Sequence, residues 1–256
     1  MANQLFAFNN KCSNLLTCGL LNLNHAKAAT LQIEQDLIRR QLNILCVTEP
    51  YVTKGHVVGF TNKYTKIYSV GSPRAAIILN TNFSFASIEI SRDIIAINLT
   101  VNNINFIFIS VYCSPSDDIV SILQQLESII EVHQDSFISI NGDFNAKSSE
   151  WGPTEQDERG KALLELFFRQ DLDIGNDIYS APTFDFVRGK SWIDLTLTKN
   201  ISREVFKNWV VHQDVAIHFI TYEITYEKSE RPKHKCWKIE DLKLIDFRKD
   251  LKTKRN

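Results

Sequence analysis

Asn141-Gly142-Asp143-Phe144-Asn145-Ala146 directly follows the apolar run Ser136–Ile140, and this stretch decides the fold that we expect. The isoleucine and phenylalanine content of the run favours a buried β-strand. Asp143 and Asn145 would present two hydrogen-bonding side chains from the end of this strand into a cleft, where α/β and β-sandwich enzymes keep their chemistry. Because Gly, Asp and Asn are also ordinary turn residues, the stretch alone leaves open a strand followed by an Asx-type turn.

Length and composition favour one large globular domain. The chain has 256 residues, of which 44% are hydrophobic and 11% aromatic, so it can bury a full core. Its formal net charge is −1. This balance excludes a global basic field as an indication of nucleic-acid binding, but it allows a local basic patch.

The cysteines and the N-terminal residues indicate an intracellular protein. The five cysteines are widely spaced, with no CxxC pair and no zinc-ligand spacing, which favours reduced thiols. Residues 1–17 hold no basic segment before an apolar stretch, and no apolar run approaches the length of a membrane span. We therefore expect a soluble protein without a membrane partner.

Short β-rich segments interrupted by three helices make up the chain. Apolar residues at helical spacing predict helices at Lys27–Gln41, Ile119–His133 and Gly160–Asp171. β-Branched and aromatic content predicts strands at Leu42–Thr48, Ala75–Leu79, Ile94–Val101, Phe106–Val111, Phe137–Ile140, Trp192–Thr198 and Ala216–Ile224. This order predicts an α/β fold in which two packed, mainly antiparallel or mixed sheets are flanked by helices. Residues 1–226 would form this domain, and the Lys-rich segment 227–256 is interpreted as a charged linker.

Four further polar residues are associated with predicted strands. Glu49 and Tyr112 each end an apolar strand, and Asn22 ends the first strand of the chain. Asp194 lies within an otherwise apolar segment, where burying an unpaired carboxylate would cost several kcal/mol. Together with Asp143, these residues indicate one polar site at one end of the fold.

Such a set of residues suits metal-assisted attack on a phosphodiester. A glutamate holds Mg²⁺ through oxygen ligands and leaves positions for water and phosphate. An aspartate orients or deprotonates the attacking water, while asparagine and tyrosine donate hydrogen bonds to the phosphoryl oxygens. Sites of this kind also hold an Asp-His pair, in which Asp194 would orient the imidazole.

Several motifs occur in order along the chain. They are Asn22, Glu49-Pro50, Tyr112 with Ser114-Pro115, Gly142–Ala146, Trp151-Gly152, Arg159-Gly160, Pro182–Phe184 and Ser191–Leu195. This series resembles the endonuclease/exonuclease/phosphatase superfamily, and within it the apurinic-like endonuclease domain of non-LTR retrotransposons, particularly arthropod elements. Gly71–Ala76 and Asn24–Ala29 support that subgroup, and the tail with Trp237 and Asp246-Phe247 resembles the segment that precedes reverse transcriptase.

The resemblance implies a DNase I-like four-layer α/β sandwich that nicks target DNA and leaves a 3′-hydroxyl primer. Glu49 would be the ligand of Mg²⁺, with Mn²⁺ as an alternative, and Asn22 would lie close to the metal or the phosphate. The other implied roles are phosphate contact for Tyr112, handling of the nucleophilic water for Asp143, stabilisation of the phosphoryl oxygens for Asn145, and orientation of a catalytic histidine for Asp194. The implied partners are duplex DNA and a reverse transcriptase domain in cis, and the implied place of action is the nucleus.

The catalytic histidine is where the chain departs from this family pattern. Members have a Ser-Asp-His triplet several residues beyond a tryptophan such as Trp209, whereas here four residues separate Trp209 from Asp214. The simplest interpretation is that a short segment with the triplet is missing between Asp214 and Val215. Alternatively, Asp214 serves as the acid, and His212 or His218 replaces the imidazole.

We favour the deletion, because His218 follows the period-2 pattern of a strand and His212 precedes its acid. A lone histidine in a strand is more often structural than catalytic. Losing one member of a cooperating catalytic set costs orders of magnitude in rate while part of the binding survives. We therefore expect an endonuclease fold with weak or no nicking activity.

Three other functions stay open from the sequence. They are a phosphoesterase acting on phosphoinositides or sphingomyelin, a non-catalytic DNA-binding module and a cellular abasic-site repair nuclease. For the functions that involve DNA, we expect a local phosphate-binding patch. It would be formed by basic residues in loops near the strand ends: Lys54, Lys63, Lys66, Arg74, Lys147, Arg188 and Lys190.

Overall fold

The computed structural model describes residues 14–186, 189–214 and 217–226. The helices are α1 (Lys27–Arg39), α2 (Ile119–Val132) and α3 (Glu158–Gln170). The strands are β1 (Leu15–Asn22), β2 (Ile44–Thr48), β3 (Val52–Thr53), β4 (His56–Val57), β5 (Tyr64–Tyr68), β6 (Ala75–Asn80), β7 (Ser84–Ile90), β8 (Ile94–Val101), β9 (Ile104–Tyr112), β10 (Phe137–Asp143), β11 (Asp173–Ile174), β12 (Phe184–Phe186), β13 (Gly189–Ser191), β14 (Asp194–Lys199), β15 (Phe206–Asp214) and β16 (Ile217–Thr225). The proposed linker 227–256 lies outside the described residues.

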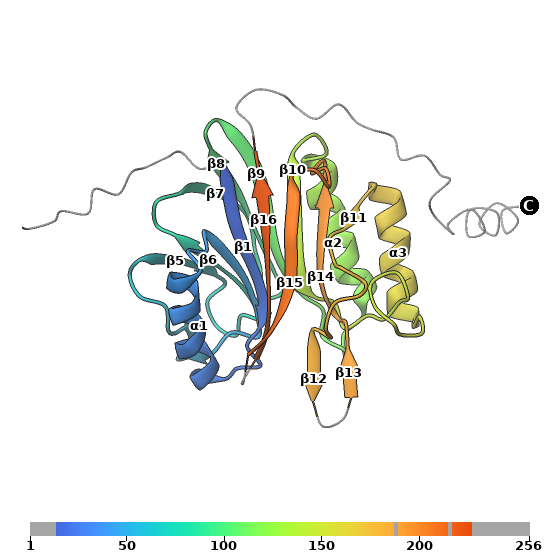
Figure 1. Ribbon diagram of the computed structural model, residues 1–256, viewed down its shortest axis with the longest axis horizontal. Helices are drawn as coiled ribbons and strands as arrows, with labels where there is room; N and C mark the ends of the chain where they lie inside the picture. Colours follow the sequence, from blue (N-terminus) through green and yellow to red (C-terminus); the bar gives the residue numbers. More distant parts are fainter. Residues whose placement is uncertain (1–13, 187–188, 215–216, 227–256) are drawn as a thin grey trace, which may run out of the picture.

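Two six-stranded mixed sheets form the centre of the fold (Figure 1). The first sheet has the order β15-β16-β1-β2-β6-β5, and the second has the order β11-β14-β10-β9-β8-β7. In each sheet one central pair is parallel, β1 with β2 and β9 with β10, while the other pairs are antiparallel. The parallel pairs bring the carboxyl ends of neighbouring strands to the same edge of each sheet.

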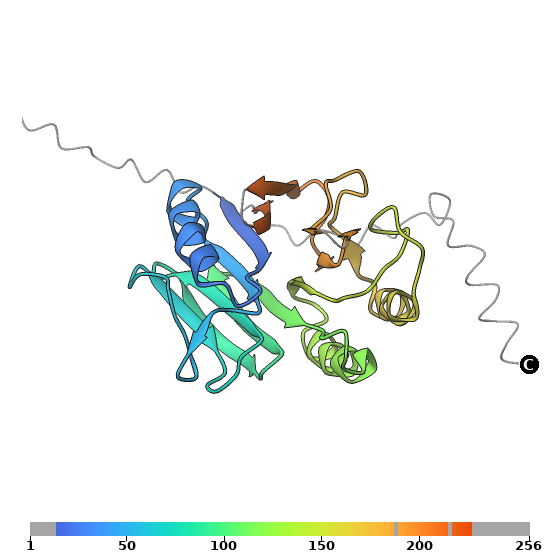
Figure 2. The same cartoon turned by 90° about the horizontal axis from the view of Figure 1, so that it is seen from below.

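Helices cover the outer faces of both sheets, which gives four layers (Figure 2). One apolar cluster, which includes Leu20 and Phe108, lies between the sheets. A second joins the other face of the second sheet to α2 and α3, and a third joins the first sheet to α1. The predicted α/β sandwich of two helix-flanked sheets is therefore confirmed.

Local sequence explains where the helices begin. The Asp118 side chain accepts a hydrogen bond from the Val120 amide and caps α2, and Asp157 caps α3 through the Gly160 amide. All three helices lie close to their predicted ranges. Asp171 ends α3 in the left-handed conformation, which aspartate tolerates better than most residues.

Among the predicted strand boundaries that were wrong, those of β10 and β14 matter for the site. β10 does not end at Ile140 but continues to Asp143, because Asn141–Asp143 pair with β9 on one side and with β14 on the other. β14 begins at Asp194 rather than at Trp192, so Asp194 opens the strand instead of lying inside it. Asp143 and Asp194 consequently stand opposite each other in the ladder.

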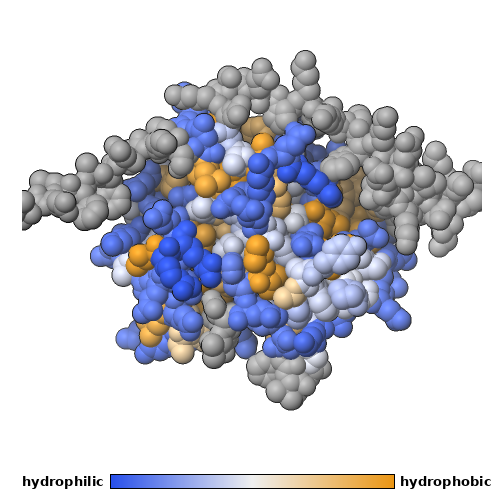
Figure 3. Space-filling view, in the orientation of Figure 1, coloured by the Kyte–Doolittle hydropathy of each residue, from blue (hydrophilic) through white to orange (hydrophobic). Residues whose placement is uncertain are grey.

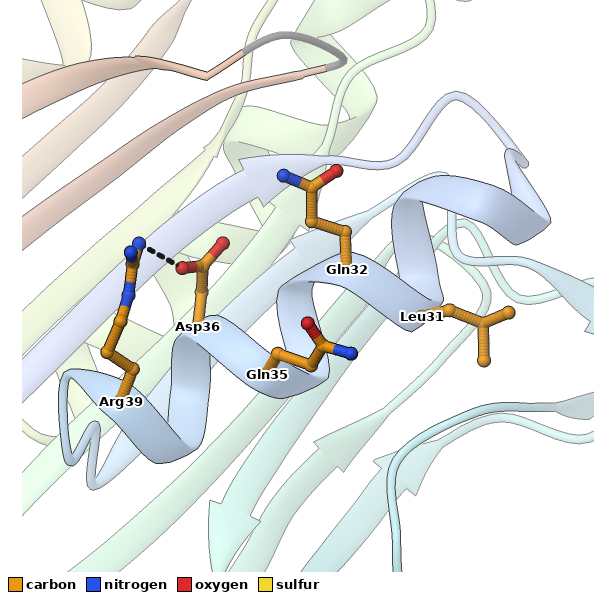
Figure 4. Close-up of a pocket in the computed structure, with 5 residues that line it drawn as sticks. All are labelled: Leu31, Gln32, Gln35, Asp36 and Arg39. Atoms are coloured by element: carbon orange, nitrogen blue, oxygen red, sulfur yellow. Dashed lines mark hydrogen bonds and ion pairs between the residues drawn. The ribbon is translucent and has the colours of Figure 1, made fainter.

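The described surface has shallow hollows away from these carboxylates. One of about 460 Å³ lies on α1 and is lined by Leu31, Gln32, Gln35, Asp36 and Arg39, with an ion pair between Arg39 and Asp36 (Figure 4). On the face shown in Figure 3, hydrophobic residues lie in small groups separated by hydrophilic ones. Within the described residues, no helix is long and apolar enough to cross a membrane.

Candidate active site

The Asn22 side chain links two carboxylates that come from different sheets. Its amide nitrogen donates to Glu49 Oε2 at 3.0 Å and to Asp143 Oδ2 at 2.9 Å. Asn22 ends β1 and Glu49 follows β2 in the first sheet, whereas Asp143 ends β10 in the second. The structure thus brings together three of the residues that the sequence predicted to share one site.

Tyr112 completes the cluster from the end of β9. Its hydroxyl donates to Glu49 Oε1 at 2.7 Å, and its backbone pairs with Asp143. Burial, followed by the hydrogen bond to Glu49, raises the pKa of Tyr112, so the phenol stays a neutral donor at physiological pH. The Arg74 guanidinium lies over the Tyr112 ring at 5.2 Å from its centroid. This cation–π contact helps to hold the ring in place.

Asp143 is buried, with 3% of its surface exposed. The pKa of its carboxyl is raised to about 7, mainly by burial and also by the nearby Glu49 carboxylate, while hydrogen bonds from the Asn22 side chain and the Asn145 amide oppose the shift. A carboxyl group that titrates near neutral pH can accept a proton from water at that pH. This is the property that a general base at the site would need.

The turn after Asp143 is held by a residue that sequence reasoning did not assign to the site. Arg159, in the first turn of α3, donates to the carbonyl oxygens of Cys113, Asp117, Phe144 and Asn145. Its planar fork suits several acceptors at fixed positions. The only sequence signal for Arg159 was its place in the Arg159-Gly160 motif of the resemblance.

The sequence left open whether Asn145 belongs to an Asx-type turn or to the site, and the structure places it in such a turn next to the site. Its backbone amide donates to Asp143 Oδ1 at 3.0 Å, which is an Asx-type turn, and its φ of 47° is left-handed. Its side-chain amide donates to the Cys113 carbonyl at 3.1 Å. Asn145 thus lies beside the carboxylate cluster, and its predicted contact with a phosphoryl oxygen stays a prediction.

Asp194 is fully enclosed next to Asp143. Burial and the neighbouring Asp143 carboxylate raise its pKa. Its backbone is held on both sides by side chains: Thr183 Oγ1 accepts from the Asp194 amide, and Asn176 donates to the Asp194 carbonyl at 2.9 Å. Within the described part of the chain, Asp194 Oδ1 is buried without a hydrogen-bond partner. No local sequence signal pointed to Asn176, because it lies in a loop and contacts the site through the backbone of β14.

The two histidines among the candidate substitutes for the missing Asp-His have partners outside the carboxylate cluster. His212 bonds Thr221 through Nε2 at 2.8 Å and packs against Phe219, whose side chain belongs to the cluster under α1. His218 bonds the Pro182 carbonyl at 2.9 Å. Asp214 ends β15 opposite Ile217, so the β15–β16 pairing leaves two residues between the strands. The roles of these residues stay predictions.

The expected basic patch is only partly available. Arg74 is engaged by Asp93 and Asp117, Lys66 donates to the Val57 and Gly59 carbonyls, and Lys190 pairs with Asp185. Local acceptors already contact these three cations, and their part in a phosphate-binding patch stays a prediction. The exposed members of the set are Lys54, Lys63, Lys147 and Lys190, while Arg188 lies outside the described residues.

The cluster fits a hard divalent cation that also uses substrate and water. No group of three or more His, Cys, Asp or Glu residues forms a self-contained metal site within the described ranges. Glu49 and Asp143, held together by Asn22, instead provide two carboxylates at one place. Mg²⁺ is commonly bound by one or two carboxylates, with waters and phosphate completing its shell.

Comparisons with known proteins agree with this geometry. Residues 106–216 match the family model described as endonuclease-reverse transcriptase. The fold is similar to the endonuclease domain of TRAS1, a telomere-specific non-LTR retrotransposon, with a TM-score of 0.74, 24% identity and coverage of 83% of this chain and 100% of that one. It is also similar to the catalytic domain of Xenopus laevis APE2 (TM-score 0.64, 14% identity, 82% and 91% coverage) and to the AP endonuclease LMAP from Leishmania major (0.63, 8%, 89% and 92%). No curated protein sequence matches the chain.

Proposed function

We propose that the chain belongs to the endonuclease/exonuclease/phosphatase superfamily and is a DNA endonuclease domain of the non-LTR retrotransposon type. The family-model match over residues 106–216 and the similar folds of known endonuclease domains support this proposal. It would hydrolyse a phosphodiester of target DNA with Mg²⁺ or Mn²⁺ and leave a 3′-hydroxyl primer. In this proposal a reverse transcriptase domain acts in cis, and the nucleus is the place of action.

The observation that carries the proposal is the Asn22 bridge between Glu49 and Asp143. A single amide that donates to both carboxylates keeps them side by side although they belong to different sheets. Structural packing alone offers no reason to gather two carboxylates and a phenol at a strand edge, since each carboxylate raises the cost of ionising the other. Phosphodiester hydrolysis uses all three groups.

Each residue has a role that its contacts support. Glu49 would hold the cation, whose charge offsets the negative charge developing on the phosphoryl oxygens. Asp143, with its pKa near 7, would orient the attacking water and accept its proton. Tyr112, kept protonated by burial, and the Asn145 amide would donate hydrogen bonds to the phosphoryl oxygens.

We further propose that this domain is catalytically impaired. Asp194 Oδ1 is buried and without a partner in the described residues, at the place where an imidazole would be oriented. A buried acceptor without a donor costs about 1–3 kcal/mol, so the arrangement suggests that Asp194 has kept its place after losing the group that it bonded. The short β15–β16 connection supports the same reading, because it leaves no segment long enough for the Ser-Asp-His triplet and its neighbours.

The experiment that tests the reaction type examines the ends of the DNA that is cut. A chain with Ser-Asp-His restored after Asp214 is incubated with supercoiled plasmid and Mg²⁺, and the nicked product is offered to a DNA polymerase without further treatment. We expect direct extension, because hydrolysis of this type leaves a 3′-hydroxyl. Nicks that are extended only after a 3′-phosphatase treatment would contradict the proposed chemistry, and Glu49→Gln in the same background controls for a contaminating nuclease.

The second candidate is a DNA-binding remnant without turnover, and the Asp194 oxygen that has no partner among the described residues favours it. Binding of duplex DNA by the native chain in EDTA, measured by fluorescence anisotropy, together with no nicking by the restored chain, would support this candidate over the enzyme.

A further inference from the structure

His25 lies beside the carboxylate cluster and has no role in the proposed mechanism. Its Nε2 atom is 3.7 Å from Glu49 Oε1. The imidazole is 56% exposed and the Glu49 side chain 19%, so the pair lies at the mouth of the site rather than in the core. Glu49 is therefore flanked by Tyr112 and Asn22 inside and by a ring nitrogen outside.

The backbone fixes His25 next to Glu49. The Leu23 amide donates to the Thr48 carbonyl and the His25 amide to the Glu49 carbonyl, both at 2.9 Å. His25 and Glu49 both have left-handed backbones, with φ values of 57° and 45°. Left-handed backbones are uncommon outside glycine, although histidine adopts them more readily than glutamate, and they persist where surrounding contacts enforce them. Backbone hydrogen bonds therefore fix the positions of His25 and Glu49 relative to each other, so their proximity does not depend on side-chain length alone.

A hydrogen bond decides which ring nitrogen faces the site. His25 Nδ1 lies 3.1 Å from the Pro50 carbonyl oxygen, which can only accept, so Nδ1 carries the proton. Nε2 then presents a lone pair toward a carboxylate oxygen. A cation between these two atoms would turn the approach of two acceptors into an attraction.

We infer that His25 is a nitrogen ligand of the cation held by Glu49, and that it shifts the preference of the site toward Mn²⁺ or Zn²⁺ and away from Mg²⁺. This inference rests on the proposed function, in which Glu49 is the metal ligand. An ion about 2.0–2.2 Å from each atom spans the gap between Nε2 and Oε1. Imidazole suits transition metals, whereas an oxygen-only site suits Mg²⁺. A metal-bound histidine also usually donates its other ring N–H to a carbonyl or carboxylate, as Nδ1 does here.

The test detects nitrogen bound to the metal directly. Mn²⁺ alone is added to the full chain, and electron spin-echo modulation spectra are recorded for the native protein and for His25→Ala, His218→Ala and His56→Ala. His56 is an exposed histidine whose ring contacts Tyr68 rather than the site, so it is the matched control. We expect ¹⁴N modulation in the native, His218→Ala and His56→Ala proteins and its loss in His25→Ala.

Affinity gives a second readout. His25→Ala should weaken Mn²⁺ binding at least about tenfold in calorimetric titration, in the range typical of disturbed metal shells, while Mg²⁺ binding stays nearly unchanged. Mn²⁺ bound without ¹⁴N modulation, or modulation that survives in His25→Ala, would overturn the inference and leave the proposed function standing. Mn²⁺ binding that is unaffected by Glu49→Gln would instead count against the metal role of Glu49 and so against both.

Discussion

Asp143 shows how one residue can be costly for the fold and useful for the site. Burial raises its pKa from 3.8 to about 7. A folded-state pKa above the unfolded value means that this carboxyl favours the folded state most below about pH 4 and loses that contribution as the pH rises toward about 7. The protein therefore keeps an unfavourable ionisation at neutral pH, at the position where an acceptor of a proton is needed.

The raised pKa of Asp143 predicts how its removal changes stability at different pH values. In metal-free buffer, Asp143→Asn should raise the thermal unfolding temperature relative to the native chain at pH 8 and have less effect at pH 5, because the amide cannot ionise. The matched control is Asp171→Asn, an exposed aspartate whose left-handed backbone asparagine also tolerates. A stabilisation by Asp143→Asn that does not depend on pH would contradict the assigned cause.

We also expect Arg159 to contribute to the stability of the fold through its backbone contacts. Arg159→Lys should lower the free energy of unfolding by about 2–4 kcal/mol, because lysine keeps the charge but cannot reach four carbonyl oxygens as the guanidinium does. Denaturant titration measures this loss. Arg169→Lys is the control, since Arg169 bonds Glu127 at an exposed site and should change stability by less than about 1 kcal/mol. Equal losses in the two variants would show that the carbonyl contacts matter little.

At the scale of elements, β10 sets the geometry of the site. Ile138 and Ile140 face α2 and α3, so the alternate residues Ser139 and Asp143 face the first sheet. A glycine is required at 142, because a Cβ there would meet the backbone carbonyl of Val111 on β9. The polar end of β10 therefore stays paired with β9 and β14, which fixes the position of Asp143 in the site.

Gly142→Ala tests that role. We expect a loss of about 3 kcal/mol or more in unfolding free energy, because the blocking atom is backbone and cannot move without opening the ladder. Gly19→Ala in β1 should cost about 1 kcal/mol, because its nearest neighbours are the side-chain ends of Leu45 and Leu42. Chemical denaturation of both variants gives the comparison, and a Gly19 loss as large as the Gly142 loss would argue against this packing.

The elements also show what the sequence could predict. The three helices carry clear apolar spacing and were predicted close to their observed ranges. β15 was not predicted, and a register shift between Lys207 and Val210 interrupts its alternation. The end of β10 was missed because its polar residues are paired by neighbouring strands, which is information that lies far away in the sequence.

At the scale of the whole molecule, the site exists only because two sheets pack together. Asn22 and Glu49 come from one sheet, and Tyr112, Asp143 and Asp194 from the other. Sequence motifs could name these residues, but the amide bridge and the unpartnered Asp194 oxygen depend on contacts across the sandwich. His25 and Asn176 were missed for the same reason, since neither has a local pattern that distinguishes it from other loop residues.

A buried polar contact between the sheets gives a prediction at this scale. The Ser139 and Tyr222 hydroxyls are 2.8 Å apart, and Asn141 donates to the Ser139 hydroxyl at 3.1 Å. Ser139→Ala should therefore cost about 2 kcal/mol and Tyr222→Phe about 1 kcal/mol, because the first change removes the partner of two buried groups and the second the partner of one. Thermal and urea unfolding of both variants measures the difference, and the reverse order would contradict this account of the inter-sheet contact.

In the proposed function, this chain keeps the carboxylate cluster of an endonuclease site but has lost the Ser-Asp-His triplet. The most direct measurement is the rate of supercoiled plasmid nicking with Mg²⁺, for the native chain and for the chain with Ser-Asp-His restored after Asp214. We expect the restored chain to nick at least about 100-fold faster, which is the usual contribution of a positioned acid or base, and Glu49→Gln to abolish the gain. Equal and robust nicking by both chains would contradict the claim.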